Sequence, residues 1–147
     1  MTALIQRLRK EEKGLTLIEL LAVIVIIGII AAIAVPLITG MLDKTKENAR
    51  VATANQLFEA AKLRSIAKFN GEMKEVHTLD ELISEGYIQG GLTDPKEGKP
   101  FDNTLTKVDL GGVKSNTTIV TLYVDGKTVG EFTIDQLTKS TVTATAP

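Results

Sequence analysis

The chain has 147 residues, a net charge of -1 and an aromatic content of only 4%. This length suits one modest domain plus an anchor, and the charge gives no sign of a nucleic-acid-binding surface. The absence of cysteine excludes disulfide and thiolate chemistry. With one histidine and no glycine-rich phosphate loop, the chain carries no catalytic motif, so we expect no enzyme, cofactor or metal.

A basic N-terminal stretch precedes a long apolar run. Residues 1–14 contain four Lys and Arg against two Glu, whereas Leu15–Val35 contains one charged residue, Glu19. As a helix this run would be about 31 Å long, which matches the hydrocarbon core of a bilayer. The basic flank orients such a segment with its N-terminus in the cytoplasm and the rest of the chain outside. A secretory signal peptide cut near Ala34 is an alternative, although its apolar region would normally be shorter.

The start of the apolar run carries a recognisable signal. Gly14–Glu19 reads Gly-Leu-Thr-Leu-Ile-Glu, with Gly28 in the middle of the run and Pro36 at its end. This pattern resembles the class III signal of type IV prepilins and type II-like pseudopilins. The resemblance implies that a membrane prepilin peptidase cuts between Gly14 and Leu15 and then methylates the new amine of Leu15.

Glu19 is costly to place alone in lipid, so it needs a positively charged partner. Cleavage would leave a cation at Leu15, four residues before Glu19. In a filament of bundled helices, Glu19 of one subunit would meet the Leu15 amine of another and fix the register between subunits. The alternatives are that Glu19 reaches the lipid headgroups or pairs within its own chain.

Two residues weaken the outer part of this helix. Gly28 lowers the helix propensity, and Pro36 removes a backbone hydrogen-bond donor. We expect the stretch between them to be flexible, as the resemblance also implies, with a simple kink as the alternative.

An amphipathic helix is predicted beyond the apolar run, ending near Phe69 and before Asn70-Gly71. Its less polar positions recur every three to four residues: Ile38, Met41, Leu42, Thr45, Ala49, Ala52, Ala54, Leu57, Phe58 and Ala61. Basic residues mark its wetter faces: Lys44, Lys46, Arg50, Lys62, Arg64 and Lys68. Since acids are interleaved with them, we interpret these residues as a solvated face and not as a nucleic-acid stripe.

The segment after the long helix begins with a helix start signal. Thr78–Glu81 is a capping box, and it predicts a short helix of about 7 residues that ends at Gly86. His77 lies just before the box, and we expect it to be a surface residue.

A loop-rich stretch follows at 90–101, with Asp94-Pro95, Gly98 and Pro100-Phe101. It resembles the loop that covers the junction of helix and sheet in many pseudopilins and Gram-positive pilins. Three aspartates in and after this loop are too far apart for a calcium-binding loop, and we expect them to be solvated: Asp94, Asp102 and Asp109.

Apolar alternation predicts strands at 105–110, 117–124 and 128–134, the last two forming a hairpin around Asp125-Gly126. A three-residue loop would keep the apolar side chains on one face: Val120, Leu122, Val124, Phe132 and Ile134. That face would pack on the outer half of the long helix. The predicted fold class is α+β, a long N-terminal α-helix with a membrane half and an amphipathic half, packed on a small antiparallel β-sheet head.

These patterns divide the chain into four parts. Residues 1–14 would be a leader peptide, and residues 15–35 a transmembrane and assembly helix. Residues 36–137 would be the outer part of the long helix and the head. The threonine- and alanine-rich residues 138–147 would form a flexible tail.

The resemblance implies a structural subunit of a type IV pilus-like filament. The chain would first be a single-pass protein of the inner or cytoplasmic membrane. After trimming, a cytoplasmic ATPase and a membrane platform protein would assemble it into a homo-oligomeric filament at or outside the cell surface. A competence or secretion pseudopilin shares the N-terminal signal, and a single-pass anchor with a non-polymerising head is a further alternative.

Overall fold

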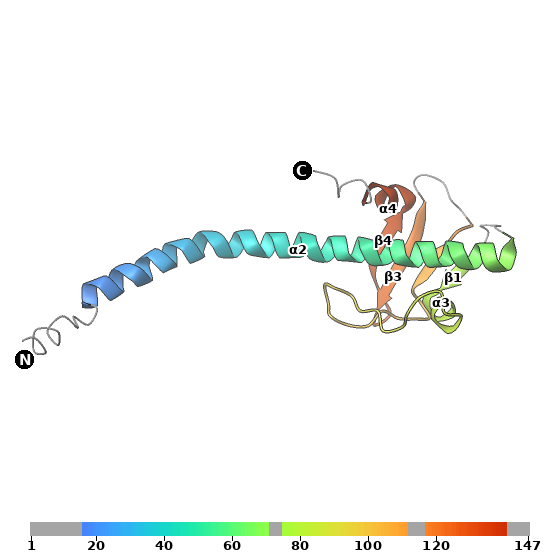
Figure 1. Ribbon diagram of the computed structural model, residues 1–147, viewed down its shortest axis with the longest axis horizontal. Coiled ribbons are helices and arrows are strands. Elements are labelled where there is room, and N and C mark those ends of the chain that lie inside the picture. The colour runs from blue at the N-terminus through green and yellow to red at the C-terminus, as the bar shows by residue number, and fades with distance from the viewer. Residues whose placement is uncertain (1–15, 71–74, 112–116, 141–147) are drawn as a thin grey trace, which may run out of the picture. The chain divides into compact units, whose positions relative to one another are not determined.

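The computed structural model describes residues 16–70, 75–111 and 117–140 (Figure 1). Its elements are α2 (Leu17–Phe69), β1 (Val76–Thr78), α3 (Leu79–Ser84), β2 (Lys107–Asp109), β3 (Thr118–Val124), β4 (Lys127–Thr133) and α4 (Ile134–Ser140). The chain forms two compact units, which meet in sequence between Leu42 and Asp43.

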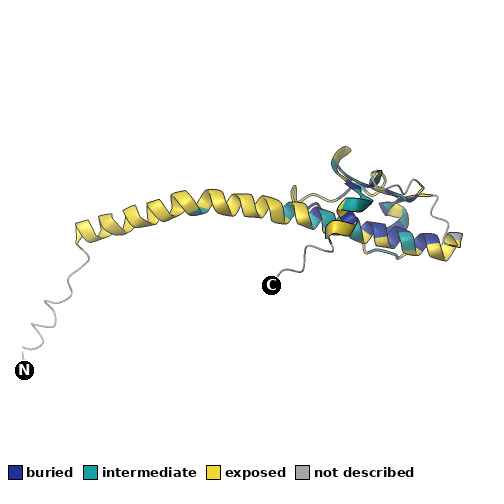
Figure 2. Ribbon diagram, turned by 90° about the horizontal axis from the view of Figure 1, so that it is seen from above, coloured by how far each residue is buried: buried dark blue, intermediate teal, exposed yellow. Residues whose placement is uncertain are grey.

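The first unit contains the N-terminal part of α2. Its large apolar side chains are exposed on every face of the helix, with exposed fractions from 47% at Val23 to 85% at Leu17. Figure 2 shows this part of α2 almost entirely as exposed. Within the described residues, α2 is the only helix long and apolar enough to cross a membrane, and none of its apolar stretch is buried. A helix that is apolar all round requires apolar surroundings, which this unit does not supply by itself.

The second unit is an α+β head in which the C-terminal part of α2 packs on a four-stranded antiparallel sheet of order β1-β2-β3-β4. The core residues come from α2, α3, β2, β3, β4, α4 and the segments between them: Ala54, Leu57, Phe58, Ala60, Ala61, Leu79, Leu82, Phe101, Val108, Leu110, Ile119, Val120, Leu122, Val124, Phe132 and Leu137. The predicted fold class is therefore confirmed. The predicted stripe on α2 is confirmed at Ala54, Leu57 and Ala61, but Thr45 and Ala52 are exposed.

The ends of the first two helices match the sequence signals. α2 ends at Phe69, followed by Asn70 in a left-handed conformation with φ of 50°, as asparagine allows after a helix. The Thr78 hydroxyl accepts a bond from the Glu81 amide, and the Glu81 carboxylate accepts one from the Thr78 amide. The predicted capping box is therefore present, and α3 spans 6 residues. β1, which pairs Val76–Thr78 with β2, was not predicted.

The hairpin loop differs from the prediction. Val124 pairs with Lys127, so the loop has two residues, Asp125 and Gly126, both with positive φ. This is the conformation that two-residue hairpin turns favour. A β-bulge at Val129 supplies the odd residue instead, because Tyr123 pairs with Thr128 while Leu122 pairs with Gly130. The apolar face is preserved by the bulge and not by a longer loop.

Three further boundaries are corrected. Ile134, predicted to end the last strand, begins α4. Residues 138–140, assigned to a flexible tail, form the end of α4, and Leu137 just before them is buried in the core. The remaining tail residues, 141–147, lie outside the described residues. The predicted strand at 105–110 is shorter than expected, because β2 covers only Lys107–Asp109.

Candidate assembly site

The predicted processing residues Gly14 and Leu15 lie outside the described residues. The described chain begins with Thr16, which acts as the N-cap of α2. The Thr16 amide and hydroxyl both donate to Glu19 Oε2, at 2.8 Å each, and the Glu19 amide donates to the Thr16 hydroxyl at 3.3 Å. This reciprocal arrangement is a second capping box, which the sequence reasoning missed.

The capping box gives Glu19 a role within its own chain. A carboxylate in the first turn of a helix interacts favourably with the helix dipole and with the unpaired amides there. Within the described residues, the Thr16 amide and hydroxyl both bond to Oε2 of this carboxylate. Oε1 is therefore available for another donor, so capping and pairing with an amine are geometrically compatible on one carboxylate.

Gly28 and Pro36 lie inside a continuous α2. A Cβ added at Gly28 would meet nothing within 4 Å, so this glycine has no packing reason within one subunit. Pro36 cannot donate to the carbonyl one turn earlier, and the Thr39 hydroxyl donates to the Pro36 carbonyl at 3.0 Å. Flexibility between Gly28 and Pro36 stays a prediction.

Two arginines assigned to the wet face of α2 are instead buried, which corrects that interpretation. Arg50 is 6% exposed and Arg64 is 7% exposed. Arg50 donates from Nε and Nη2 to the two oxygens of Asp94, at 2.6 Å each, and from Nη1 to the Val129 carbonyl at 3.0 Å. Asp94, expected to be solvated, is fully buried.

The electrostatics of this pair follow from its hydrogen bonds. Burial raises the pKa of Asp94, but the bonds from Arg50 and from the Glu97 amide outweigh burial and hold the pKa below its ordinary value of 3.8. A planar guanidinium matches a carboxylate with two parallel bonds, which lysine cannot do. The pair therefore fastens the loop around Asp94 to α2.

Arg64 forms a second cluster near the C-terminal end of α2. It donates from Nε and Nη2 to the Glu85 carboxylate at 2.9 and 3.0 Å, and Lys68 donates to the same carboxylate at 2.5 Å. These bonds lower the pKa of Glu85 from 4.5 to about 2. His77, expected on the surface, is fully buried beside Arg64, which is a further correction.

The positions of the two arginines held a signal that could have revealed their burial. Arg50 and Arg64 lie four residues before Ala54 and three after Ala61, on the same helical face as the core positions. A charged residue in phase with a buried stripe predicts an internal ion pair. The choice of arginine over lysine at both positions points the same way.

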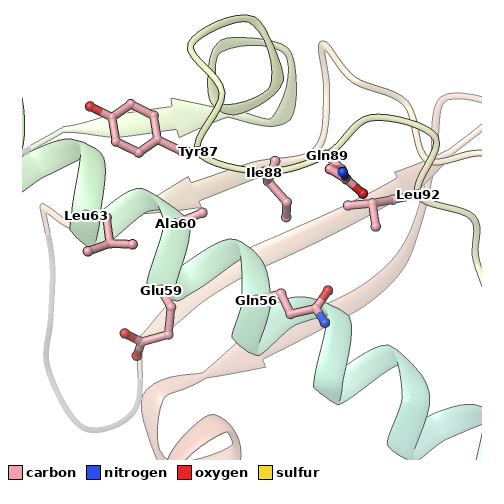
Figure 3. A pocket seen from close by; sticks show the side chains of 8 residues that line it. All are labelled: Gln56, Glu59, Ala60, Leu63, Tyr87, Ile88, Gln89 and Leu92. Atoms are coloured by element: carbon pink, nitrogen blue, oxygen red, sulfur yellow. The ribbon is translucent and has the colours of Figure 1, made fainter.

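A shallow groove lies between α2 and the segment that follows α3 (Figure 3). Its volume is about 500 Å³, and its lining is Gln56, Glu59, Ala60, Leu63, Tyr87, Ile88, Gln89 and Leu92. Glu59 and Tyr87 are the ionisable side chains of this lining. Within the described residues, no three His, Cys, Asp or Glu side chains gather into a metal-binding group.

Comparison with known proteins places these features in a family. The model of the prokaryotic N-terminal methylation motif matches residues 9–35. The type IV narrow pilus major component PilA5 of Thermus thermophilus is 35% identical over 94 residues, which cover 64% of this chain and 75% of that protein. The type IV major alpha-pilin of Moraxella bovis is 36% identical over 109 residues, which cover 71% of this chain and 63% of that protein. No solved structure matches the chain. With its N-terminal methylation motif, exposed apolar helix and α+β head, the chain belongs to the type IV pilin family, whose members are structural subunits and not enzymes.

Proposed function

We propose that this chain is a major subunit of a type IV pilus, processed at Gly14-Leu15 and polymerised through the N-terminal part of α2. The observation that carries the proposal is that the methylation motif and the exposed apolar part of α2 overlap in sequence. The methylation motif at 9–35 covers the start of a helix whose large apolar side chains are at least 47% exposed up to Leu42. Such a surface requires lipid before assembly and neighbouring helices after it.

Assembly by this route requires dedicated machinery. Lipid tails are as apolar as the side chains of α2, so moving the helix from the membrane into a bundle gains little hydrophobic free energy. We therefore include a prepilin peptidase, an assembly ATPase and a membrane platform protein among the partners. The subunit would wait in the inner or cytoplasmic membrane and leave it as part of a cell-surface filament.

Glu19 is proposed to act twice. Its Oε2 caps α2 through Thr16, and its Oε1 would accept from the methylated amine of Leu15 on a neighbouring subunit. Pairing would cancel two charges that are each costly in an apolar core. A subunit displaced along the filament would leave both charges unpaired, so the pair would select one register.

Processing is tested by intact mass and N-terminal sequencing of the protein purified from its host. The proposal expects a mature chain that begins with N-methylated Leu15. A chain that keeps Met1 would contradict it in favour of a membrane anchor. A chain that begins after Ala34 would contradict it in favour of a secreted domain.

The pairing is tested with two variants of Glu19. Glu19→Gln keeps an acceptor for Thr16 but loses the charge, since glutamine also serves in capping boxes. Glu19→Ala loses both. We expect both variants to be processed and both to form few filaments, with Glu131→Ala as the matched control because Glu131 is an exposed acid on β4. Normal filaments from Glu19→Gln would exclude charge pairing and leave capping as the role of the residue.

A further inference from the structure

The cluster at the C-terminal end of α2 contains the only histidine of the chain, His77. Its side chain belongs to β1 and is fully buried. The His77 Nδ1 atom lies 2.6 Å from Arg64 Nη1. The same Arg64 Nη1 donates to Glu81 Oε2 at 3.3 Å, and its other nitrogens hold Glu85.

This contact fixes the protonation state of the ring. A guanidinium has five N–H donors and no acceptor, so His77 Nδ1 must be the acceptor and must carry no proton. The folded head therefore requires a neutral imidazole with its proton on Nε2. A proton added to Nδ1 would replace an attractive contact with two donors and two positive charges facing each other at 2.6 Å.

The charges around the ring come from three directions. Arg64 faces it from α2, Glu81 and Glu85 from α3 and its C-cap, and Glu75 from the position before β1. The three carboxylates favour a protonated ring, whereas burial and Arg64 oppose it. Burial and Arg64 prevail and lower the pKa of His77 below the 6.5 of a free imidazole.

We propose that His77 is an acid-sensitive latch: protonation of its buried Nδ1 breaks the contact with Arg64 and releases the last turns of α2 from β1 and α3. The ion pair between Arg50 and Asp94 contains no group that titrates near neutral pH. Mild acid should thus loosen the contacts of Arg64 at the end of α2 and leave the ion pair between Arg50 and Asp94 intact.

The direction in which stability changes with pH follows from proton linkage. The unfolded chain takes up a proton at His77 near pH 6.5, whereas the folded head takes it up only at lower pH. The contribution of His77 to stability is complete above pH 6.5. It is lost progressively as the pH falls from 6.5 toward the pKa of the folded state.

The first test is an NMR titration of the imidazole in the full-length protein, purified in detergent without a histidine tag. One histidine in the chain gives one imidazole spin system. We expect nitrogen shifts of an Nε2–H tautomer at neutral pH and a titration midpoint below 6.5. An Nδ1–H tautomer, or a midpoint at or above 6.5, would overturn the proposal.

The second test is amide hydrogen exchange between pH 7 and pH 5, corrected for the intrinsic exchange rate. We expect the amides of residues 61–68 to lose protection about tenfold or more as His77 is protonated, while those of β3 and β4 keep theirs. His77→Asn should abolish this difference, because its amide oxygen takes the place of Nδ1 and does not titrate. Equal loss of protection at both ends, or an unchanged acid response in His77→Asn, would refute the latch. The titration of the unmodified chain decides the question if that variant does not fold.

Discussion

The guanidinium of Arg50 and the carboxylate of Asp94 form two parallel hydrogen bonds of 2.6 Å between residues 44 positions apart. The third donor of Arg50 reaches the Val129 carbonyl, at the bulge of β4. One side chain therefore joins α2, the loop around Asp94 and the hairpin. This link explains how a loop rich in glycine and proline holds one conformation over the head.

Removal of one partner of this pair should strongly destabilise the head. Arg50→Met would leave the Asp94 carboxylate buried without its partner, at a cost of about 3–5 kcal/mol. The measurement is chemical denaturation of the full-length protein in detergent, followed by the tyrosine signal of the head. A matched control is Lys99→Met, which breaks the exposed pair with Asp125 and should cost no more than about 1 kcal/mol. Equal losses of unfolding free energy in the two variants would contradict a stabilising role for the buried ion pair of Arg50.

Helix-stiffening substitutions should test the predicted flexibility between Gly28 and Pro36. Gly28→Ala adds a methyl group that meets nothing within 4 Å in the subunit and raises helix propensity by about 1 kcal/mol. We expect slower amide exchange between these residues in the subunit and a reduced yield of filaments. Gly40→Ala is the matched control, since its Cβ also meets nothing within 4 Å and it lies outside the stretch. A normal filament yield from Gly28→Ala would show that this stretch need not bend.

Loss of the N-cap should fray the start of α2. Thr16→Val keeps the shape of the side chain but removes the hydroxyl that bonds Glu19, at a cost of about 1 kcal/mol in the first turn. Thr16→Ser should retain the cap. Amide exchange at Leu20, whose N–H donates to the Thr16 carbonyl, reports the difference directly. If Thr16→Val and Thr16→Ser exchange alike, the hydroxyl does not cap the helix.

Strong acid should remove the contribution of Glu85 to the stability of the head. Its pKa of about 2 in the folded head lies below the 4.5 of a free glutamate. The unfolded chain therefore binds the proton first, and the stability that Glu85 contributes above pH 4.5 falls as the pH drops toward 2. Thermal unfolding of Glu85→Gln should show a weaker decline in this range than the parent chain. The loss of stability below pH 6.5 that we assign to His77 should persist in the variant.

Much of the fold was predictable because local signals were strong. The apolar run, the end of α2 at Phe69 and the capping box of α3 each depend on neighbouring residues. The alternation in β3 and β4 likewise indicated the correct core face. The family followed from a motif of adjacent residues around Gly14.

What the sequence did not reveal depends on contacts between distant segments. Burial of Arg50 requires Asp94, and burial of His77 requires Arg64, and no local pattern links the members of either pair. The hairpin has a two-residue turn and not the predicted odd-length loop. The bulge at Val129 provides the extra residue that keeps the apolar side chains on one face. The cap at Thr16 was not predicted, although Thr16 and Glu19 have the three-residue spacing of a capping box.

The bond from Arg50 to Val129 closes a stretch of 79 residues. Contacts of such separation form late, since the entropy of bringing the ends together must be overcome first. If the chain leaves the membrane from α2 onward, Arg50 emerges long before β4 and stays hydrated until Val129 follows. The contact between Arg50 and Val129 can then form only after nearly the whole chain has left the membrane.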